Sequence, residues 1–187
     1  MEIKVVGPDD LVIKQGEFGT VFVRSPGLFH GYYKNKQNTK QALTRSRWLN
    51  TDDRGYIDQT GRLIVTGRCS DVIRVHTAFI LPSSVEAFIK QVPEVHDVIV
   101  LAVPNDVAFE EVAACIIPKA GSGLTEDDVI SFFRRQHLPS AGETFAATFP
   151  GLIFLFDDFP RLYNGKPDRK KLKTQAIRKA NEMKRNT

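Results

Sequence analysis

The stretch Gly67-Arg68-Cys69-Ser70-Asp71 separates two parts of the sequence that carry different patterns of apolar residues. Over residues 1–67, short apolar runs alternate with Gly, Pro and Asp turns, a pattern typical of strands joined by hairpins. Over residues 68–187, strand-like runs alternate with helix-like ones. We therefore expect an α+β fold in which a β-rich N-terminal piece precedes a small mixed α/β domain.

The N-terminal piece offers little material for a core of its own. Gly7-Pro8-Asp9-Asp10 separates two apolar runs, at residues 5–6 and 11–13, which predicts a hairpin. These short elements are too open to close a core without further packing. The other elements expected here are strands at 20–24 and 61–65 and a polar helix over 38–44.

Two amphipathic helices are expected in the C-terminal part. Ser83 opens the first with the capping-box spacing to Glu86, which accounts for Glu86 structurally, so we assign Glu86 no catalytic role. Apolar residues then recur at helical spacing, namely Val85, Phe88, Ile89 and Val92. The remaining expected elements are strands at 72–75, 98–103, 112–117 and 152–156, a helix from Thr125, and a last helix after Asp168.

The composition is that of an ordinary globular protein, with 42% hydrophobic and 26% charged residues. The net charge is +4, and the excess of positive charge lies mostly in the last third of the chain. No aromatic residues interleave with this basic run for base stacking, so we expect no nucleic-acid partner. The run is interpreted as the solvated face of a terminal helix.

Cysteine and histidine usage points to an intracellular protein without a metal site. Cys69 and Cys115 lie far apart and form no CxxC motif, so we expect reduced thiols, as in the cytoplasm or mitochondria. The four histidines have no metal-ligand spacing with each other or with cysteine. No apolar run reaches the length of a membrane span, and the first residues have no signal-peptide character.

The segment RLYNGKPDR at residues 161–169 contains the most informative lysine of the chain. Asn164-Gly165 and Pro167 favour turns and interrupt helices and strands. Lys166 is therefore expected to project from a tight loop rather than from the face of a helix or strand. An ammonium on a flexible stem suits a phosphate oxygen or a carboxylate. Taken alone, the same pattern also fits a solvated lysine in a surface turn.

An ordered series of short motifs resembles the AMP-forming acyl-CoA synthetases, and most of all the fatty acyl-CoA ligases. The resemblance spans nearly the whole chain but only the C-terminal portion of the family. Residues 1–67 resemble the last, β-rich part of the large AMP-binding domain, and residues 68–187 resemble the mobile C-terminal domain. The motifs are Gly16-Glu17, Gly31-Tyr32-Tyr33, Trp48 through Asp53, Gly61, Gly67-Arg68 with Asp71, Glu86, and Asn164-Gly165-Lys166.

The resemblance implies an ATP-dependent ligase. In that family an acid and ATP give an acyl-adenylate and pyrophosphate, and the thiol of CoA then displaces AMP. The implied cofactors are ATP/AMP, Mg and CoA, and the implied partners are a carboxylic acid, most readily a fatty acid, and CoA. The chain has no Ser/Thr/Gly-rich phosphate loop, and the resemblance implies that the acid pocket belongs to the family's N-terminal domain. We therefore expect the chain to be incomplete for the full reaction.

The resemblance also implies roles for individual residues. Lys166 corresponds to the catalytic lysine that bridges the acid and the α-phosphate during adenylation. Asp53 corresponds to the carboxylate that binds the ribose hydroxyls, and Arg68 to an arginine that contacts the nucleotide. Two structural alternatives stay open, because Asp53 also fits a turn residue and Arg68 also fits a surface ion pair with a neighbouring Asp.

Two further roles follow from the same resemblance. The small domain of the family pivots just after the Gly-Arg pair, which places the hinge at Ser70, where Asp or Lys is more usual. The CoA channel is expected to pass Arg74 and Thr77, and Thr77 replaces a glycine whose lack of a side chain leaves room for the thiol.

Other departures from the family pattern favour a second function. Asp52 replaces a glycine beside the nucleotide, which adds negative charge near a polyanion. The loop from Pro139 to Pro150 looks longer than usual. Together with Thr77, Asp52 supports the alternative of a non-catalytic remnant that binds adenylate or a protein partner.

Overall fold

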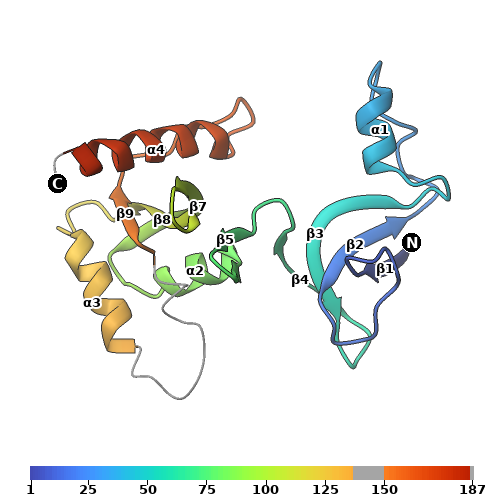
Figure 1. Cartoon of the computed structure of the whole chain (residues 1–187), viewed down its shortest axis with the longest axis horizontal. Helices are drawn as coiled ribbons and strands as arrows, with labels where there is room; N and C mark the ends of the chain where they lie inside the picture. Colours follow the sequence, from blue (N-terminus) through green and yellow to red (C-terminus); the bar gives the residue numbers. More distant parts are fainter. Residues whose placement is uncertain (137–149, 186–187) are drawn as a thin grey trace. The chain divides into compact units, whose positions relative to one another are not determined.

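The computed structural model describes residues 1–136 and 150–185 (Figure 1). The described chain forms two compact units, Met1–Asp71 and Val72–Thr187. The division therefore falls directly after the stretch Gly67-Arg68-Cys69-Ser70-Asp71. The loop from Pro139 to Pro150, which the sequence marks as unusually long, lies almost entirely outside the described residues.

The first unit is a four-stranded antiparallel sheet with one short helix. Its strand order β1-β2-β3-β4 follows the sequence, as in a meander. The predicted strand at residues 11–13 is not formed, because Val12 contributes only an isolated bridge to Val6. The elements are β1 (Glu2–Val6), β2 (Gly19–Arg24), α1 (Lys36–Ala42), β3 (Leu49–Ile57) and β4 (Leu63–Arg68).

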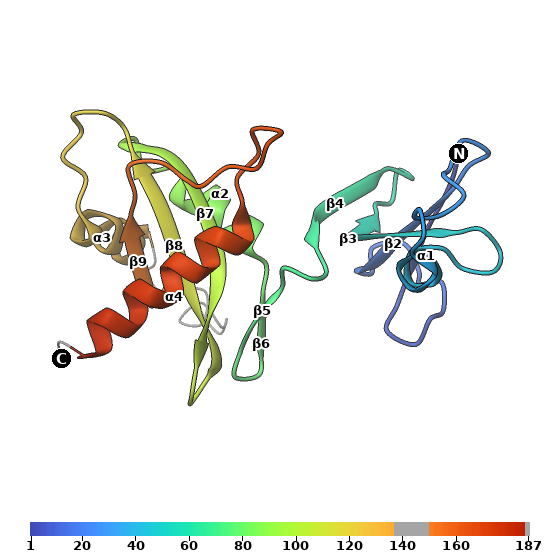
Figure 2. The ribbon, with the colours of Figure 1, turned by 90° about the horizontal axis from the view of Figure 1, so that it is seen from above.

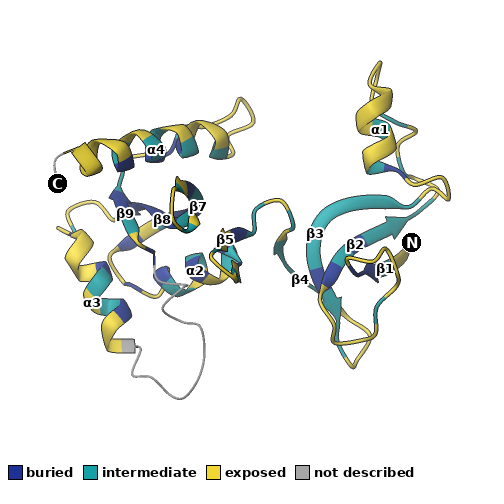
Figure 3. Ribbon diagram, in the orientation of Figure 1, coloured by how far each residue is buried: buried dark blue, intermediate teal, exposed yellow. Residues whose placement is uncertain are grey.

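The first unit buries few apolar side chains (Figure 3). Among its described residues the buried hydrophobic ones are Val5, Val6, Val21 and Leu43, and neither of the two larger core clusters extends into it. Gly55 lets β3 approach β4 closely, since a Cβ there would collide with the Ile64 carbonyl oxygen. The sequence expectation that this piece cannot build a full core is confirmed.

The second unit has helices on both faces of a mixed sheet (Figure 2). Four strands run in the order β6-β5-β8-β7, and the fifth, β9, pairs in parallel with β8. This arrangement confirms the expected α+β class. The elements are β5 (Ile73–Val75), β6 (Ala78–Ile80), α2 (Pro82–Ile89), β7 (Val95–Asn105), β8 (Phe109–Pro118), α3 (Glu126–Gln136), β9 (Leu152–Leu155) and α4 (Arg169–Arg185).

Alternation along β7 and β8 produces two cores. Val98, Val100 and Ile116 pack with α2 and α3 on one face, whereas Ile99 and Cys115 pack with α4 on the other. Successive side chains of a strand point to opposite faces, so a sheet that is covered on both faces needs an uninterrupted apolar run. This requirement explains the continuous apolar runs at residues 98–103 and 112–117.

The two helix starts in this unit differ from each other. At α3, Thr125 and Asp128 form a reciprocal cap, with the Thr125 amide 2.9 Å from Asp128 Oδ2 and the Asp128 amide 3.2 Å from Thr125 Oγ1. The capping box predicted between Ser83 and Glu86 is wrong, because α2 begins at Pro82 and has no side-chain cap at Leu81. Proline is preorganised for the first helical position, which shifts the start and releases Glu86 for another contact.

Burial raises the pKa of the Cys115 thiol to about 12, against the nearby charges of Lys179 and Arg169. The unfolded thiol loses its proton above its ordinary value of 9.0, while the folded thiol keeps it. We therefore expect the free energy of unfolding to fall as the pH rises from 9.0 to about 12, by up to about 1.4 kcal/mol per pH unit. Urea unfolding at several alkaline pH values would show this slope. Cys115→Ala should remove the contribution of the thiol to the pH dependence of the free energy of unfolding. Equal slopes in both proteins would contradict the assignment.

Candidate active-site residues

Lys166 lies in a hydrogen-bonded loop between Arg161 and Pro167, which form an isolated bridge. The Leu162 amide donates to the Lys166 carbonyl at 2.8 Å, and the Gly165 amide donates to the Leu162 carbonyl at 2.9 Å. Gly165 has a φ of 81°, a conformation that glycine adopts without steric cost. Within the described residues the exposed Lys166 ammonium has no hydrogen-bond or ion-pair partner.

Side chains brace this loop on its N-terminal side. Arg161 donates from Nη1 to the Gly165 carbonyl at 3.2 Å and from Nη2 to Asp158 Oδ1 at 2.9 Å. The hydrogen bond from Arg161 lowers the pKa of the Asp158 carboxyl below its ordinary value. The loop is therefore held by a charge-assisted contact to its own backbone, so the backbone that carries Lys166 is fixed while its ammonium stays accessible.

The loop runs directly into α4 at its other end. The Asp168 amide donates to the Pro160 carbonyl at 2.7 Å, which closes the base of the loop. Asp168 Oδ1 accepts from the Lys171 amide at 3.0 Å and caps the helix. The position of Lys166 therefore follows that of the first turn of α4.

Asp53 and Arg68 lie opposite each other in the first unit. They are paired in the register of β3 and β4, and Arg68 Nε lies 3.1 Å from Asp53 Oδ1. Arg68 Nη1 also donates to the Thr51 carbonyl at 2.9 Å. The structure thus brings the two predicted nucleotide-binding residues together, in the ion pair that the sequence left open as an alternative.

Asp52 is engaged by the predicted hinge residue. Ser70 Oγ donates to Asp52 Oδ2, and the Cys69 amide donates to the Asp52 carbonyl at 2.7 Å. Asp52 has a φ of 61°, in the left-handed region that favours glycine. The conformation explains why a glycine suits this position, and the Ser70 contact holds the added carboxylate.

Substitution of Asp52 should release the segment around Ser70. Asp52→Gly removes the acceptor of the Ser70 hydroxyl and suits the positive φ, so we expect the Asp71 amide to exchange its hydrogen several-fold faster. Nuclear magnetic resonance can follow this exchange. Asp10→Gly is the matched control, since Asp10 also has a φ of 61° but lies in the turn after β1. An unchanged exchange rate in Asp52→Gly would show that the hydrogen bond does not restrain the segment.

Arg74 and Thr77 lie in the hairpin of β5 and β6 in the second unit. The Arg74 amide donates to Glu110 Oε2 at 2.8 Å, and its guanidinium lies 5.2 Å from the centre of the Phe109 ring. Thr77 is exposed, beside His76, which has a φ of 51°. In the described part of the chain, no hydrogen bond or ion pair joins this hairpin to Lys166.

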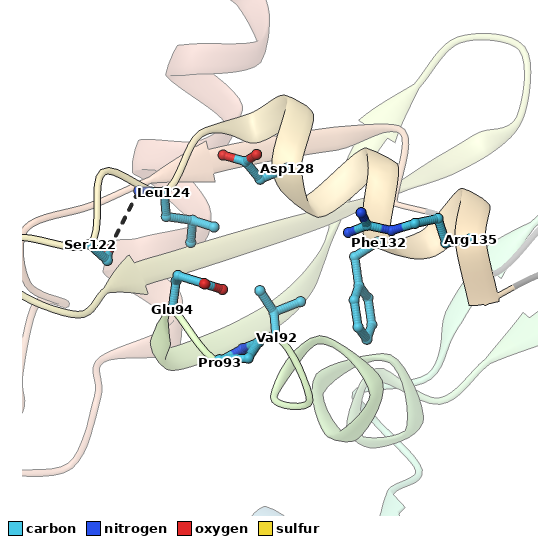
Figure 4. Close-up of a pocket in the computed structure, with 8 residues that line it drawn as sticks. All are labelled: Val92, Pro93, Glu94, Ser122, Leu124, Asp128, Phe132 and Arg135. Atoms are coloured by element: carbon cyan, nitrogen blue, oxygen red, sulfur yellow. Dashed lines mark hydrogen bonds between the residues drawn. The ribbon is translucent and has the colours of Figure 1, made fainter.

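The cavities of the second unit lie elsewhere. One of about 330 Å³ lies between α3 and the segment that follows α2, and the charged residues that line it are Glu94, Asp128 and Arg135 (Figure 4). A groove of about 710 Å³ follows α4 beside residues 155–160. Neither of these two cavities is lined by a residue that the sequence predicted for the site. Lys166 is exposed on its loop.

Residues 1–136 and 150–185 contain no group of three or more His, Cys, Asp or Glu side chains that could hold a metal ion. Over the same residues, no helix is both long enough and apolar enough to cross a bilayer. Cys69 and Cys115 are both free thiols.

Comparisons with known proteins agree with this description. Residues 84–166 match the AMP-binding enzyme C-terminal domain. The putative acyl-CoA ligase YdaB of Bacillus subtilis is 32% identical over 94% of this chain and 34% of its own length. The 4-coumarate–CoA ligase-like protein 2 of Arabidopsis thaliana is 33% identical over 74% of this chain and 25% of its own length. This chain thus spans about a third or less of these relatives.

A solved structure shows the same fold. ATP-bound MatB from Rhodopseudomonas palustris superposes with a TM-score of 0.82 over 94% of this chain and 34% of its own, at 24% identity. The fold and the matched domain define the class of adenylate-forming enzymes. The chain belongs to this superfamily and corresponds to the C-terminal portion of its AMP-forming acyl-CoA synthetases.

Proposed function

We propose that this chain contributes to ATP-dependent formation of an acyl-CoA from a carboxylic acid, and that Lys166 is its catalytic residue for adenylation. The observation that carries the proposal is an exposed Lys166 ammonium that has no partner among residues 1–136 and 150–185, on a braced loop at the end of an AMP-binding enzyme C-terminal domain. We further propose that the chain needs the preceding portion found in its relatives for the complete reaction, since it spans about a third of YdaB.

Adenylation requires a cation between two anions. A carboxylate oxygen attacks the α-phosphorus of ATP, the bond from that phosphorus to the bridging oxygen breaks, and pyrophosphate leaves. Both reactants are negatively charged, so a cation that contacts both offsets their repulsion and stabilises the charge of the transition state. An ammonium on a flexible four-carbon stem can reach both oxygens from the edge of a site.

The first unit would hold the nucleotide. A carboxylate accepts hydrogen bonds from ribose hydroxyls, which fits Asp53, and the guanidinium of Arg68 fits a phosphate or ribose oxygen. The ion pair of 3.1 Å between them orients both groups. In the second step the CoA thiolate attacks the acyl carbonyl and AMP leaves. Arg74 and Thr77 would lie beside the CoA, and Ser70 would be the hinge at which the second unit pivots between the adenylation step and the thioester-forming step.

Two classes of acid are candidates for the substrate. The sequence resemblance favours a fatty acid, whereas several relatives carry 4-coumarate–CoA ligase-like names. The second candidate function is a non-catalytic module that binds adenylate or a protein partner. Among the residues proposed to lie near the nucleotide, only Asp52 favours it. Its carboxylate would repel a phosphate whenever Ser70 releases it.

Product analysis tests the proposed reaction. The chain is joined behind the N-terminal two-thirds of YdaB, in place of the third that it matches, to give a protein that we call the joined enzyme. The joined enzyme is supplied with ATP, CoA and a short-chain, a long-chain or an aromatic acid. We expect AMP and acyl-CoA to be formed from one of these acids, and that acid identifies the substrate class. Release of no AMP with any acid, from a folded joined enzyme that still binds ATP, would support the non-catalytic module instead.

A further inference from the structure

Glu86 and Arg169 meet at one residue of an edge strand. The β7 strand ends the order β6-β5-β8-β7, so one side of its backbone has no strand partner within the described sheet. Glu86 Oε1 accepts from the Val100 amide at 2.9 Å, and Arg169 Nη2 donates to the Val100 carbonyl at 2.8 Å. The two side chains thus satisfy both backbone groups of one residue on the open edge.

The same two side chains also pair with each other. Arg169 Nη2 lies 3.5 Å from Glu86 Oε1, and the side chains are 41% and 20% exposed. Partial burial strengthens such a contact relative to a pair on the open surface. Glu86 comes from α2, which packs on one face of the sheet, and Arg169 from α4, which packs on the other. The pair therefore connects the two helix layers around the edge of the sheet.

This connection lies at the base of the lysine loop. Arg169 is the first residue of α4 and follows Lys166 by three positions. The Arg161 contact fixes the loop only to itself and to Asp158. The pair of Glu86 and Arg169 instead fixes the C-terminal end of the loop to the sheet. The residues of this sheet make up much of the larger buried core of the unit.

We propose that Glu86 and Arg169 are positioning residues for Lys166. The inference rests on the proposed function in one respect, namely that Lys166 is the adenylation cation. The pair holds Arg169, the first residue of α4, against Val100, and thereby fixes the position of the Lys166 backbone relative to the sheet. Positioning of this kind matters because a displacement of about 1 Å at a reacting group lowers rates by about 100-fold.

The structural part is tested on the chain of 187 residues itself. Glu86→Ala should accelerate hydrogen exchange at the loop amides of Leu162 and Gly165 by about 10-fold. Glu86→Gln keeps an oxygen acceptor for the Val100 amide but lacks the charge, so it should give an intermediate rate. Lys90→Ala is the matched control, because it breaks the 3.3 Å pair of Lys90 and Asp97, which also joins the end of α2 to β7.

The outcome separates positioning from edge protection. If Glu86→Ala or Glu86→Gln accelerates exchange only at Val100 and leaves Leu162 and Gly165 at the rate of the control, the pair merely covers the strand edge and the proposal fails. If the alanine variant does not fold, the glutamine variant decides by the same criterion. None of these rates depends on catalysis.

A second readout addresses the function of the pair. In the joined enzyme, Glu86→Gln should lower kcat for ATP–pyrophosphate exchange by about 10-fold with little change in KM for ATP, and it should spare acyl transfer from preformed acyl-AMP to CoA. Equal loss of both steps would contradict positioning of Lys166. An unsubstituted joined enzyme without exchange activity would instead contradict the proposed function, while the amide-exchange result would still stand.

Discussion

Lys166→Ala is expected to lower the rate of ATP–pyrophosphate exchange by the joined enzyme by about 100- to 1,000-fold. Losses of this size follow removal of one group that stabilises transition-state charge. The ammonium of Lys166 has no partner among the described residues, so its removal leaves no buried group unsatisfied in the domain. The effect should therefore be on the rate and not on folding. Isotope exchange between pyrophosphate and ATP measures the rate.

Two variants serve as controls for this result. Lys170→Ala removes an exposed lysine from the first turn of α4 and should leave the exchange rate within about two-fold. Lys166→Arg keeps the charge but places it in a planar fork, so we expect a partial loss. If Lys166→Ala exchanges pyrophosphate at the rate of the unsubstituted joined enzyme, Lys166 has no role in adenylation.

Phe133→Ala is expected to lower the free energy of unfolding of the second unit by about 3 to 5 kcal/mol. Phe133 is 2% exposed and lies in the core that α2 and α3 form with the sheet. Its ring centre is 4.7 Å from that of Phe88, so the substitution removes a ring contact and leaves a cavity. The loss is large because neighbouring helices and strands cannot collapse fully into the space.

Urea unfolding followed by far-ultraviolet circular dichroism measures this loss. The single Trp48 lies in the first unit, so its fluorescence reports on that unit and should change little. Phe79→Ala is the control, because Phe79 is 73% exposed and its removal should cost less than about 0.5 kcal/mol. Similar losses from Phe79→Ala and Phe133→Ala would contradict the packing described for α3.

The elements of the fold were largely predictable from apolar patterning. The runs at residues 98–103 and 112–117 became β7 and β8, because a sheet covered on both faces needs continuous apolar strands. The segment at 11–13 has the same apolar character and lies against its predicted partner, but it forms only one bridge, between Val12 and Val6, with backbone hydrogen bonds of 2.9 Å from the Gly7 amide to the Leu11 carbonyl and of 3.1 Å from the Ile13 amide to the Val5 carbonyl. At α2 the helix starts at Pro82, one residue before the Ser83 that the capping-box spacing predicted as the cap. The spacing rule does not take into account that proline favours the first helical position.

The candidate site was predictable in its local parts. The Asn-Gly turn and the following proline indicated a tight loop at Lys166, and the structure has that loop. The contact of Glu86 with Arg169 joins residues 83 positions apart, and no local pattern marks such a pair. The hydrogen bond from Ser70 to Asp52 joins residues 18 positions apart and is likewise marked by no local pattern.

Parallel measurement of the two half-reactions on one preparation of Lys166→Ala tests the central claim most directly. In the proposed mechanism, Lys166 assists the attack of the acid on the α-phosphate and takes no part in the displacement of AMP by CoA. We predict that ATP–pyrophosphate exchange is lost while the transfer from preformed acyl-AMP to CoA keeps its rate in the same folded joined enzyme. Equal loss of both half-reactions, or full retention of the exchange, would contradict the assignment of Lys166 as the adenylation lysine.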